Sequence, residues 1–231
     1  MSVWIKICGN TSLADARMAV EAGADAVGFV FAPSPRNVTV SEAAAIVSHL
    51  PPMVEKIGVF VDSSLEEIYS TVRASGLTGV QLHFEAGEEM PAKLRAKLGA
   101  AVRILRVVHF GAGISPGVSA HIKKYAEDTS IDGVLVDSRT DTTVGGTGLA
   151  FDWTEARKTI FGEDRRVKLI AAGGLTPANV AEAIATLRPW GVDVVSGVEA
   201  APGRKDAFKV RDFVVRARAA LFDRDSIVRM G

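Results

Sequence analysis

The chain has 231 residues, of which 48% are hydrophobic and 23% are charged, and its 27 basic residues balance its 27 acidic residues. This composition is typical of a globular protein with one substantial core. A net charge of zero gives no general attraction for nucleic acid or for an acidic membrane surface, so an anionic ligand must be bound by local groups.

The single cysteine, Cys8, excludes an internal disulfide and a zinc site made of several thiolates. The N-terminal residues show no basic stretch followed by a long apolar segment, so we expect no signal peptide. The longest apolar runs have the length of strands, so we expect no membrane span. These features predict a reducing, cytoplasmic location.

Eight short apolar runs recur along the chain, and most are rich in Val and Ile. They begin at Val3, Ala26, Lys56, Gly79, Arg103, Asp132, Val167 and Val192. Successive starts are 23 to 35 residues apart, which leaves room for a helix in each gap. The alternation predicts an α/β fold, a (β/α)8 TIM barrel with a single domain over residues 1–231. An open, doubly wound sheet is the alternative.

Helix signals stand in several of the gaps between these runs. Ser12 is predicted to cap a helix that ends at Gly23, and Ser64 one that ends at Gly76. A third helix is predicted to begin at Ser41 and to stop at Pro51. Two more are predicted to begin at Thr176, with Pro177 at the first helical position, and at Asp206. Three more helices are expected near Pro91, Pro116 and Asp152. From about residue 223 onwards we expect a loosely held, mobile tail.

Polar and small residues follow every predicted strand, at the end where ligands bind in barrels of this kind. In chain order they are Cys8, Ser34-Pro35-Arg36, Asp62, His83, His109, Asp137-Ser138, Gly173-Gly174 and Ser196-Gly197. The two glycine-containing pairs in adjacent loops favour phosphate binding through backbone N–H groups, although tight turns would also use glycine. The glycine-rich stretch from Gly145 to Gly148 is either a mobile cover or a further backbone contact.

Cys8 and Asp137 end strands on opposite parts of the rim, so the pair is suited to act as base and acid on one substrate. Alternatively, Cys8 is a packed apolar residue and Asp137 caps the following loop. Prolines 33 and 35 stiffen the loop of Arg36, so this residue is either held as a clamp for a carboxylate or is a solvated surface arginine, which is the commoner fate of an arginine. His83 either lines the pocket or caps its strand, and His109 is expected to be structural or exposed.

Several motifs together resemble the phosphoribosylanthranilate isomerase family of tryptophan biosynthesis. They are KICG from Lys6, GADAVGFVFAPSPR from Gly23, IGVFVD near Gly58, QLH from Gln81, LVDS from Leu135, GGTG with FDW from Gly145, LIAAGGLTPANV from Leu169 and SGVEAAPGRKD from Ser196. They cover nearly the whole chain in the family's order.

The resemblance implies an isomerase that performs an Amadori rearrangement of an aminoaldose phosphate to an aminoketose phosphate. Cys8 matches the family's general base, Asp137 its general acid, and Arg36 the arginine that binds the anthranilate carboxylate. The substrate-binding set is completed by His83, Gly148, Gly173, Gly174, Ser196 and Gly197. No metal or organic cofactor is implied, because the substrate's own nitrogen serves as the electron sink. The expected partner is a small phosphorylated aminosugar, with no nucleic acid or membrane, and the chain is expected to be a monomer or a homodimer.

Two residues depart from the family's usual pattern: Phe84 stands where glycine usually follows QLH, and Asn10 where an aliphatic residue usually follows KICG. They bear on fine specificity. The nearest rival is the sister isomerase of histidine biosynthesis, which typically has aspartate at the position of Cys8. Ribulose-phosphate epimerases would need metal ligands at several strand ends. The rival from another class is an inactive barrel that only binds a phosphate ester.

Overall fold

The computed structural model describes residues 2–84, 86–109, 116–137, 153–161 and 167–220. Eight parallel strands form a closed barrel in chain order, as the apolar runs predicted. The strands are β1 (Trp4–Ile7), β2 (Ala26–Val30), β3 (Glu55–Phe60), β4 (Gly79–Leu82), β5 (Arg103–His109), β6 (Gly133–Asp137), β7 (Lys168–Ala172) and β8 (Gly191–Val194).

The barrel closes between its first and last strands. β1 pairs with β2 on one side and with β8 on the other, and Lys6 is the register partner of both Ala26 and Asp193. The alternative of an open, doubly wound sheet is therefore wrong.

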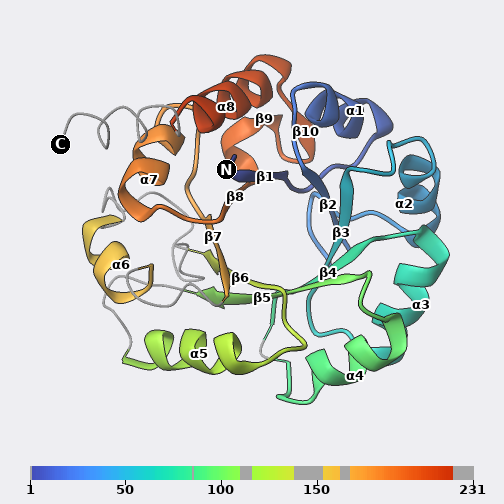
Figure 1. Ribbon diagram of the computed structural model, residues 1–231. Coiled ribbons are helices and arrows are strands. Elements are labelled where there is room, and N and C mark those ends of the chain that lie inside the picture. Colours follow the sequence, from blue (N-terminus) through green and yellow to red (C-terminus); the bar gives the residue numbers. More distant parts are fainter. Residues whose placement is uncertain (1, 85, 110–115, 138–152, 162–166, 221–231) are drawn as a thin grey trace.

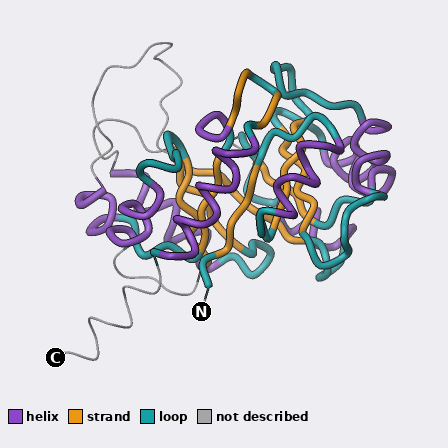
Figure 2. Tube along the Cα trace, turned by 90° about the horizontal axis from the view of Figure 1, so that it is seen from above, coloured by secondary structure: helices purple, strands orange, loops and turns teal. Residues whose placement is uncertain are grey.

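Helices form a ring around the strands (Figure 1), and a perpendicular view places the strands between the helices (Figure 2). They are α1 (Leu13–Glu21), α2 (Val40–Val47), α3 (Leu65–Ser75), α4 (Met90–Leu98), α5 (Pro116–Glu127), α6 (Trp153–Thr159), α7 (Val180–Leu187) and α8 (Ala207–Ala219). After β8, a short 3₁₀ helix (Ser196–Val198) leads into the small hairpin of β9 (Glu199–Ala201) and β10 (Arg204–Lys205).

Three of the predicted helix caps are confirmed. The Ser12 side chain accepts a hydrogen bond from the backbone N–H of Asp15, and the Asp206 side chain accepts from those of Phe208 and Lys209. Ser64 forms a reciprocal capping box with Glu67, and that helix ends at Gly76 in the left-handed conformation, with φ of 70°.

Two predicted helix starts are wrong. α2 is capped by Thr39 rather than Ser41, because Thr39 accepts from the N–H of Glu42 while the Glu42 carboxylate accepts from the N–H of Thr39. α7 begins at Val180 rather than at Pro177. Before it, the side chain of Asn179 accepts from the N–H of Thr176 at 2.8 Å and its N–H donates to the Thr176 carbonyl, so these residues form a separate turn.

The barrel has two apolar layers, because successive side chains on a strand point to opposite faces. The outer faces of the strands pack against the helices, as do Ile5, Phe29 and Leu82. The inner faces fill the barrel itself, with Trp4, Ile57, Leu105, Leu135 and Ile170 among the buried side chains. Trp4 stacks on Trp190 with ring centroids 5.2 Å apart and fills the end where the strands begin, so the opposite end is left to form a cavity.

None of the helices in the described part of the chain is long and apolar enough to cross a membrane. The tail expected from about residue 223 lies outside the described residues. That residues 1–231 form one domain stays a prediction.

Candidate active site

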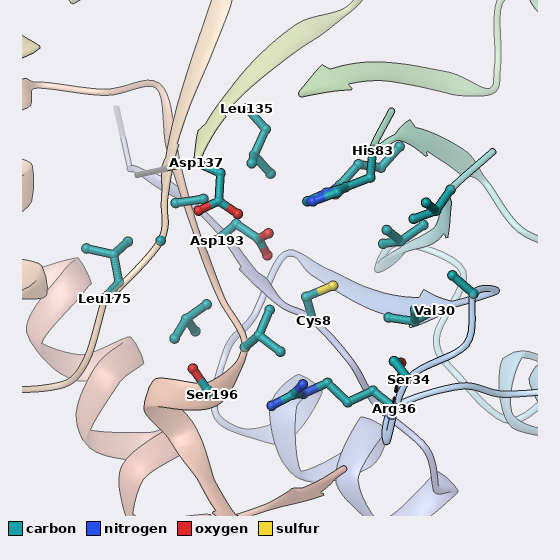
Figure 3. A pocket seen from close by; sticks show the side chains of 18 of the residues that line it. Cys8, Val30, Ser34, Arg36, His83, Leu135, Asp137, Leu175, Asp193 and Ser196 are labelled. Carbon is teal, nitrogen blue, oxygen red and sulfur yellow. Dashed lines mark hydrogen bonds between the residues drawn. The ribbon is translucent and has the colours of Figure 1, made fainter. Parts of the chain in front are cut away.

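A cavity of about 320 Å³ opens at the C-terminal ends of the strands (Figure 3). This volume is within the range of small-molecule sites. Its lining includes Cys8, Arg36, His83, Asp137, Gly173, Gly174, Ser196 and Gly197. These are all of the substrate-site and catalytic residues expected from the sequence except Gly148, which lies outside the described residues, as does Ser138.

Cys8 and Asp137 reach this cavity from β1 and β6. Cys8 directly follows β1 and is buried, and its backbone N–H donates to the carbonyl of Val194 at 2.9 Å. Asp137 is the last residue of β6 and is also buried. In Figure 3 both side chains point into the same space, so one small molecule in the cavity can contact both.

The thiol of Cys8 is held between opposing influences. Burial raises the pKa of Cys8, whereas the neighbouring ammonium group of Lys6 lowers it. Gly28 on β2 makes room for the sulfur, because a Cβ at that position would lie 2.5 Å from Sγ. The resting thiol is therefore mainly protonated, and Lys6, with a smaller contribution from Lys205, favours its ionisation.

A buried polar network that was not predicted from the sequence lies beneath the thiol. The Lys6 ammonium group donates to Asp193 at 3.0 Å and to the Gln81 side chain at 2.9 Å. Burial lowers the pKa of Lys6, but Asp193 and Cys8 together outweigh burial, so the pKa of Lys6 is raised. Asp193 also lines the cavity. The sequence contains one indication of this ion pair: Lys6 and Asp193 each lie inside an apolar strand run. A charged residue in a buried strand is expected to be paired with an opposite charge.

His83 lies half-buried on the wall of the cavity. Burial lowers the pKa of His83, although the Asp137 carboxylate acts in the opposite direction, so the imidazole is neutral at physiological pH. Its ring meets that of His109 edge-on, with centroids 5.1 Å apart. His109 itself is exposed, as expected. His83, His109 and Asp137 are the described residues whose ligand atoms come close enough together to hold a metal ion.

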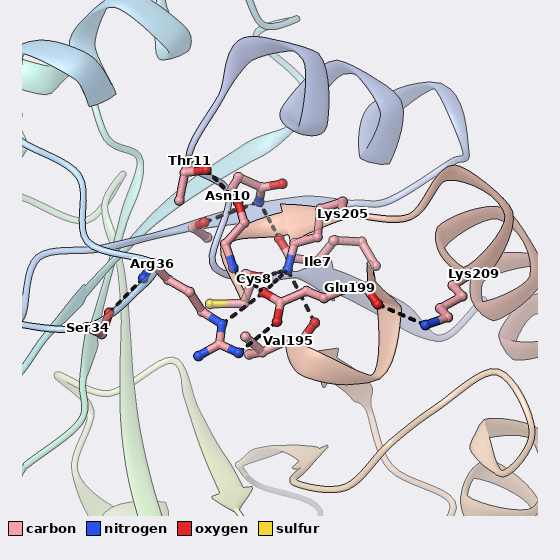
Figure 4. Close-up of polar contacts among 12 residues, drawn as sticks. Ile7, Cys8, Asn10, Thr11, Ser34, Arg36, Val195, Glu199, Lys205 and Lys209 are labelled. Carbon is pink, nitrogen blue, oxygen red and sulfur yellow. Dashed lines mark hydrogen bonds and ion pairs between the residues drawn. The ribbon is translucent and has the colours of Figure 1, made fainter. Parts of the chain in front are cut away.

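Arg36 is not a freely solvated arginine. Its Nε and Nη2 atoms donate to the two carboxylate oxygens of Glu199 at 2.8 and 2.7 Å (Figure 4). This bidentate pair raises the pKa of Arg36 and keeps the guanidinium charged. In the amino-acid sequence, Glu199 stands only within the motif that begins at Ser196, and no local pattern indicates its role.

Glu199 is also bound by Lys205, which has a fully buried side chain. The Lys205 ammonium group donates to the carbonyl of Cys8 at 2.5 Å, to that of Val195 at 3.2 Å and to Glu199 at 3.3 Å. Burial works to raise the pKa of Glu199, but Arg36 and Lys205 outweigh it and the pKa is lowered. One carboxylate therefore ties the arginine loop to the backbone of the cysteine loop.

The loops after β7 and β8 meet at the cavity. Gly173 and Gly174 have φ of 82° and 61°, in the left-handed region that favours glycine. A Cβ at Gly197 would overlap the carbonyl oxygen of Leu175, so only glycine lets the two loops approach this closely. Their backbones form one continuous wall suited to an anion.

Residues 5–216 match the family model of N-(5'-phosphoribosyl)anthranilate (PRA) isomerase. The chain belongs to this family. The isomerase of Pelobacter propionicus is 43% identical over 211 residues, which cover 91% of this chain and 93% of the relative. That of Trichlorobacter lovleyi is 44% identical over 218 residues, which cover 94% of this chain and 98% of the relative.

Solved structures of family members have the same fold. The enzyme from Thermotoga maritima is 35% identical and superposes with a TM-score of 0.78, covering 94% of this chain and 99% of that one. A family member in complex with reduced 1-(o-carboxyphenylamino)-1-deoxyribulose 5-phosphate is also 35% identical, with a TM-score of 0.77 and the same coverage.

The two departures from the family's usual pattern lie outside the cavity lining. Asn10 is buried and donates from Nδ2 to the carbonyls of Ile7 at 2.8 Å and Gly28 at 3.2 Å. Phe84 is partly buried and packs against the outer core. Asn10 thus supports the backbone around Cys8, and Phe84 does not narrow the cavity.

Proposed function

We propose that this chain isomerises N-(5'-phosphoribosyl)anthranilate to 1-(2-carboxyphenylamino)-1-deoxyribulose 5-phosphate, the step of tryptophan biosynthesis that the family performs, with Cys8 as general base and Asp137 as general acid. The observation that carries the proposal is that a thiol and a carboxyl group point into one cavity whose walls also offer a guanidinium and a glycine-lined surface.

The rearrangement needs one proton delivered and one removed. Asp137 donates a proton to the ring oxygen of the ribose while the nitrogen lone pair forms a C=N bond, and the furanose ring opens. The Cys8 thiolate then removes the proton from C2, and the electron pair moves towards the positively charged nitrogen. The resulting enolamine becomes the ketone by proton transfer to C1. Atoms and charge balance, so product and substrate are isomers.

The ends of the substrate are bound by opposite walls. Arg36 has two of its donor nitrogens on Glu199, which leaves Nη1 for the anthranilate carboxylate. The loops with Gly173, Gly174, Ser196 and Gly197 bind the phosphate through backbone N–H groups, and His83 contacts the sugar from the wall formed by β4.

The ligand is accordingly a small phosphorylated aminosugar. A family member of known structure from Thermotoga maritima is described as dimeric and was also obtained as monomers. For the present chain, a monomer or a homodimer and a cytoplasmic location stay predictions.

The test is the loss of phosphoribosylanthranilate fluorescence, measured with purified protein and no added metal. Cys8→Ala and Asp137→Asn should each lower kcat by roughly a hundredfold or more. Asp62→Asn is the matched control, since Asp62 lies in the loop that follows β3 but does not line the cavity, and its kcat should stay within about twofold of wild type.

No turnover by the wild-type protein, or full activity of either variant, would disprove the assignment. The larger bisphosphate substrate of the histidine pathway should be offered in a parallel assay. Preferential turnover of that compound would replace the proposed substrate by its rival.

A further inference from the structure

Three residues with metal-binding side chains end three neighbouring strands. His83 directly follows β4, His109 is the last residue of β5, and Asp137 is the last residue of β6. His109 and Asp137 are register partners across β5 and β6, so their backbones lie side by side at the rim of the barrel.

All three residues occupy inward-facing positions. Side chains two residues apart on a strand share a face. Leu105 and Val107 precede His109 on the inner face of β5, and Leu135 precedes Asp137 on that of β6; these apolar side chains pack inside the barrel. Gln81 precedes His83 in the same way and reaches the buried Lys6. The three side chains therefore converge on the barrel mouth.

Their spacing is close to that of a metal centre. One ligand atom of each residue lies within 4.8 Å of the others. Zinc binds nitrogen and oxygen at roughly 2.0–2.2 Å, which places tetrahedral ligands roughly 3.4 Å apart. Rotation of the side chains can shorten the distances between the ligand atoms to this value. The exposed His109 provides an entry path for the ion from solvent.

We propose that His83, His109 and Asp137 form a binding site for a divalent transition-metal ion of the zinc class, and that occupation of this site inhibits the isomerase. Inhibition follows because a carboxylate that ligates a metal ion no longer carries the proton for ring opening. This second part rests on the proposed function, whereas binding of the ion does not.

The donor set determines which ions bind. Two imidazoles and one carboxylate suit Zn²⁺, Co²⁺ and Ni²⁺, whereas Mg²⁺ and Ca²⁺ prefer oxygen ligands. Deeper in the cavity the charge of Lys6 is balanced by Asp193 at 3.0 Å. The Gln81 amide nitrogen lies 3.4 Å from Nδ1 of His83, which leaves Nε2 as the metal ligand. A neutral imidazole that ligates through Nε2 carries its proton on Nδ1, so Nδ1 no longer accepts a hydrogen bond from Gln81. Metal binding therefore involves the loss of only this weak hydrogen bond.

The binding test is titration of the metal-free protein with Co²⁺, followed by its visible absorption and by calorimetry. We expect one Co²⁺ per chain, with an affinity that falls at least tenfold in His109→Gln. His49→Gln is the matched control, since His49 is an exposed histidine in the segment between the end of α2 and the start of β3, and its loss should leave binding unchanged. Absence of binding up to about 1 mM Co²⁺, or equal affinity in His109→Gln, overturns the site.

The inhibition test adds Zn²⁺ to the fluorescence assay. His109→Gln should keep its basal turnover, because His109 does not line the substrate cavity, and it should need at least tenfold more Zn²⁺ for half-inhibition. A chelator should restore the wild-type rate. Co²⁺ binding without any inhibition would overturn the inhibitory role. Because Co²⁺ absorption needs no turnover, failure of the proposed isomerase activity would be recognised separately.

Discussion

Among the described residues, the carboxylate of Glu199 is the group that binds the Arg36 guanidinium, and its replacement by an amide of the same shape isolates the contribution of its charge. In wild type, Oε2 accepts from Arg36 Nη2 at 2.7 Å, and Oε1 accepts from Arg36 Nε at 2.8 Å and from Lys205 at 3.3 Å. In Glu199→Gln, one of these two oxygens becomes an NH₂ group that faces a cationic donor. We expect both a less stable protein and a misplaced guanidinium.

The size of the effect follows from these contacts. A hydrogen bond to a charged group contributes about 1.5–3 kcal/mol, against about 0.5–1.5 kcal/mol for a neutral one. Three contacts from cationic donors lose roughly 1 kcal/mol each, so the free energy of unfolding should fall by about 3 kcal/mol. This agrees with the lower end of the range for breaking a buried ion pair. For a chain of this length the expected decrease in Tm is roughly 6–12 °C.

Urea denaturation followed by circular dichroism measures this change, provided that both proteins show the same slope with denaturant. Glu66→Gln is the matched control, because Glu66 pairs with Lys97 at 2.5 Å but its side chain is 70% exposed. That substitution should change stability by less than about 1 kcal/mol. In the isomerase assay, Glu199→Gln should raise KM at least tenfold with a smaller change in kcat. Equal stability of the two variants, or an unchanged KM in Glu199→Gln, would refute the reasoning.

The same pair predicts a pH dependence. The pKa of Glu199 is lower in the folded protein than its ordinary value, so the folded state favours the charged carboxylate. Its contribution to stability is therefore fully present above the unfolded pKa of about 4.3 and decreases as the pH falls towards the folded pKa. The stability difference between wild type and Glu199→Gln should narrow over that acidic range. A difference that stays constant down to about pH 3 would contradict this linkage.

Three further outcomes are expected. Gly28→Ala should lower kcat roughly tenfold to a hundredfold with a smaller change in KM, because the added Cβ would lie 2.5 Å from Cys8 Sγ; an unchanged kcat argues against the sulfur's role. The kcat/KM of wild type should rise above neutral pH, because the base acts as a thiolate and burial raises the pKa of the Cys8 thiol. In Lys6→Gln this rise should begin at a higher pH, because Lys6 lowers the pKa of Cys8. A flat profile of kcat/KM from about pH 6 to about pH 9 would contradict this prediction. Ser64→Ala should reduce the free energy of unfolding by about 1 kcal/mol through loss of the cap of α3, and calorimetry showing no change in Tm would disagree.

The strands could be predicted because their signal is local. A short run of apolar, β-branched residues bounded by turn residues reports burial on both faces, and each predicted start lies within one residue of the strand observed. The start of α2 was less determined, since Ser41 and Thr39 have almost the same capping chemistry. The choice between them depended on which one had a glutamate three residues further on.

By itself, the amino-acid sequence determined the number and order of the strands, the polar or small residues that follow each of them, and the glycines of the loops after β7 and β8. Only the tertiary structure decided which of these residues act together. Lys6 meets Asp193 because β1 closes the barrel against β8, Arg36 meets Glu199 through the hairpin that follows β8, and His83, His109 and Asp137 converge through strand register. Such partners are distant in the chain, and pairing between them depends on closure and register, which no local pattern of residues specifies.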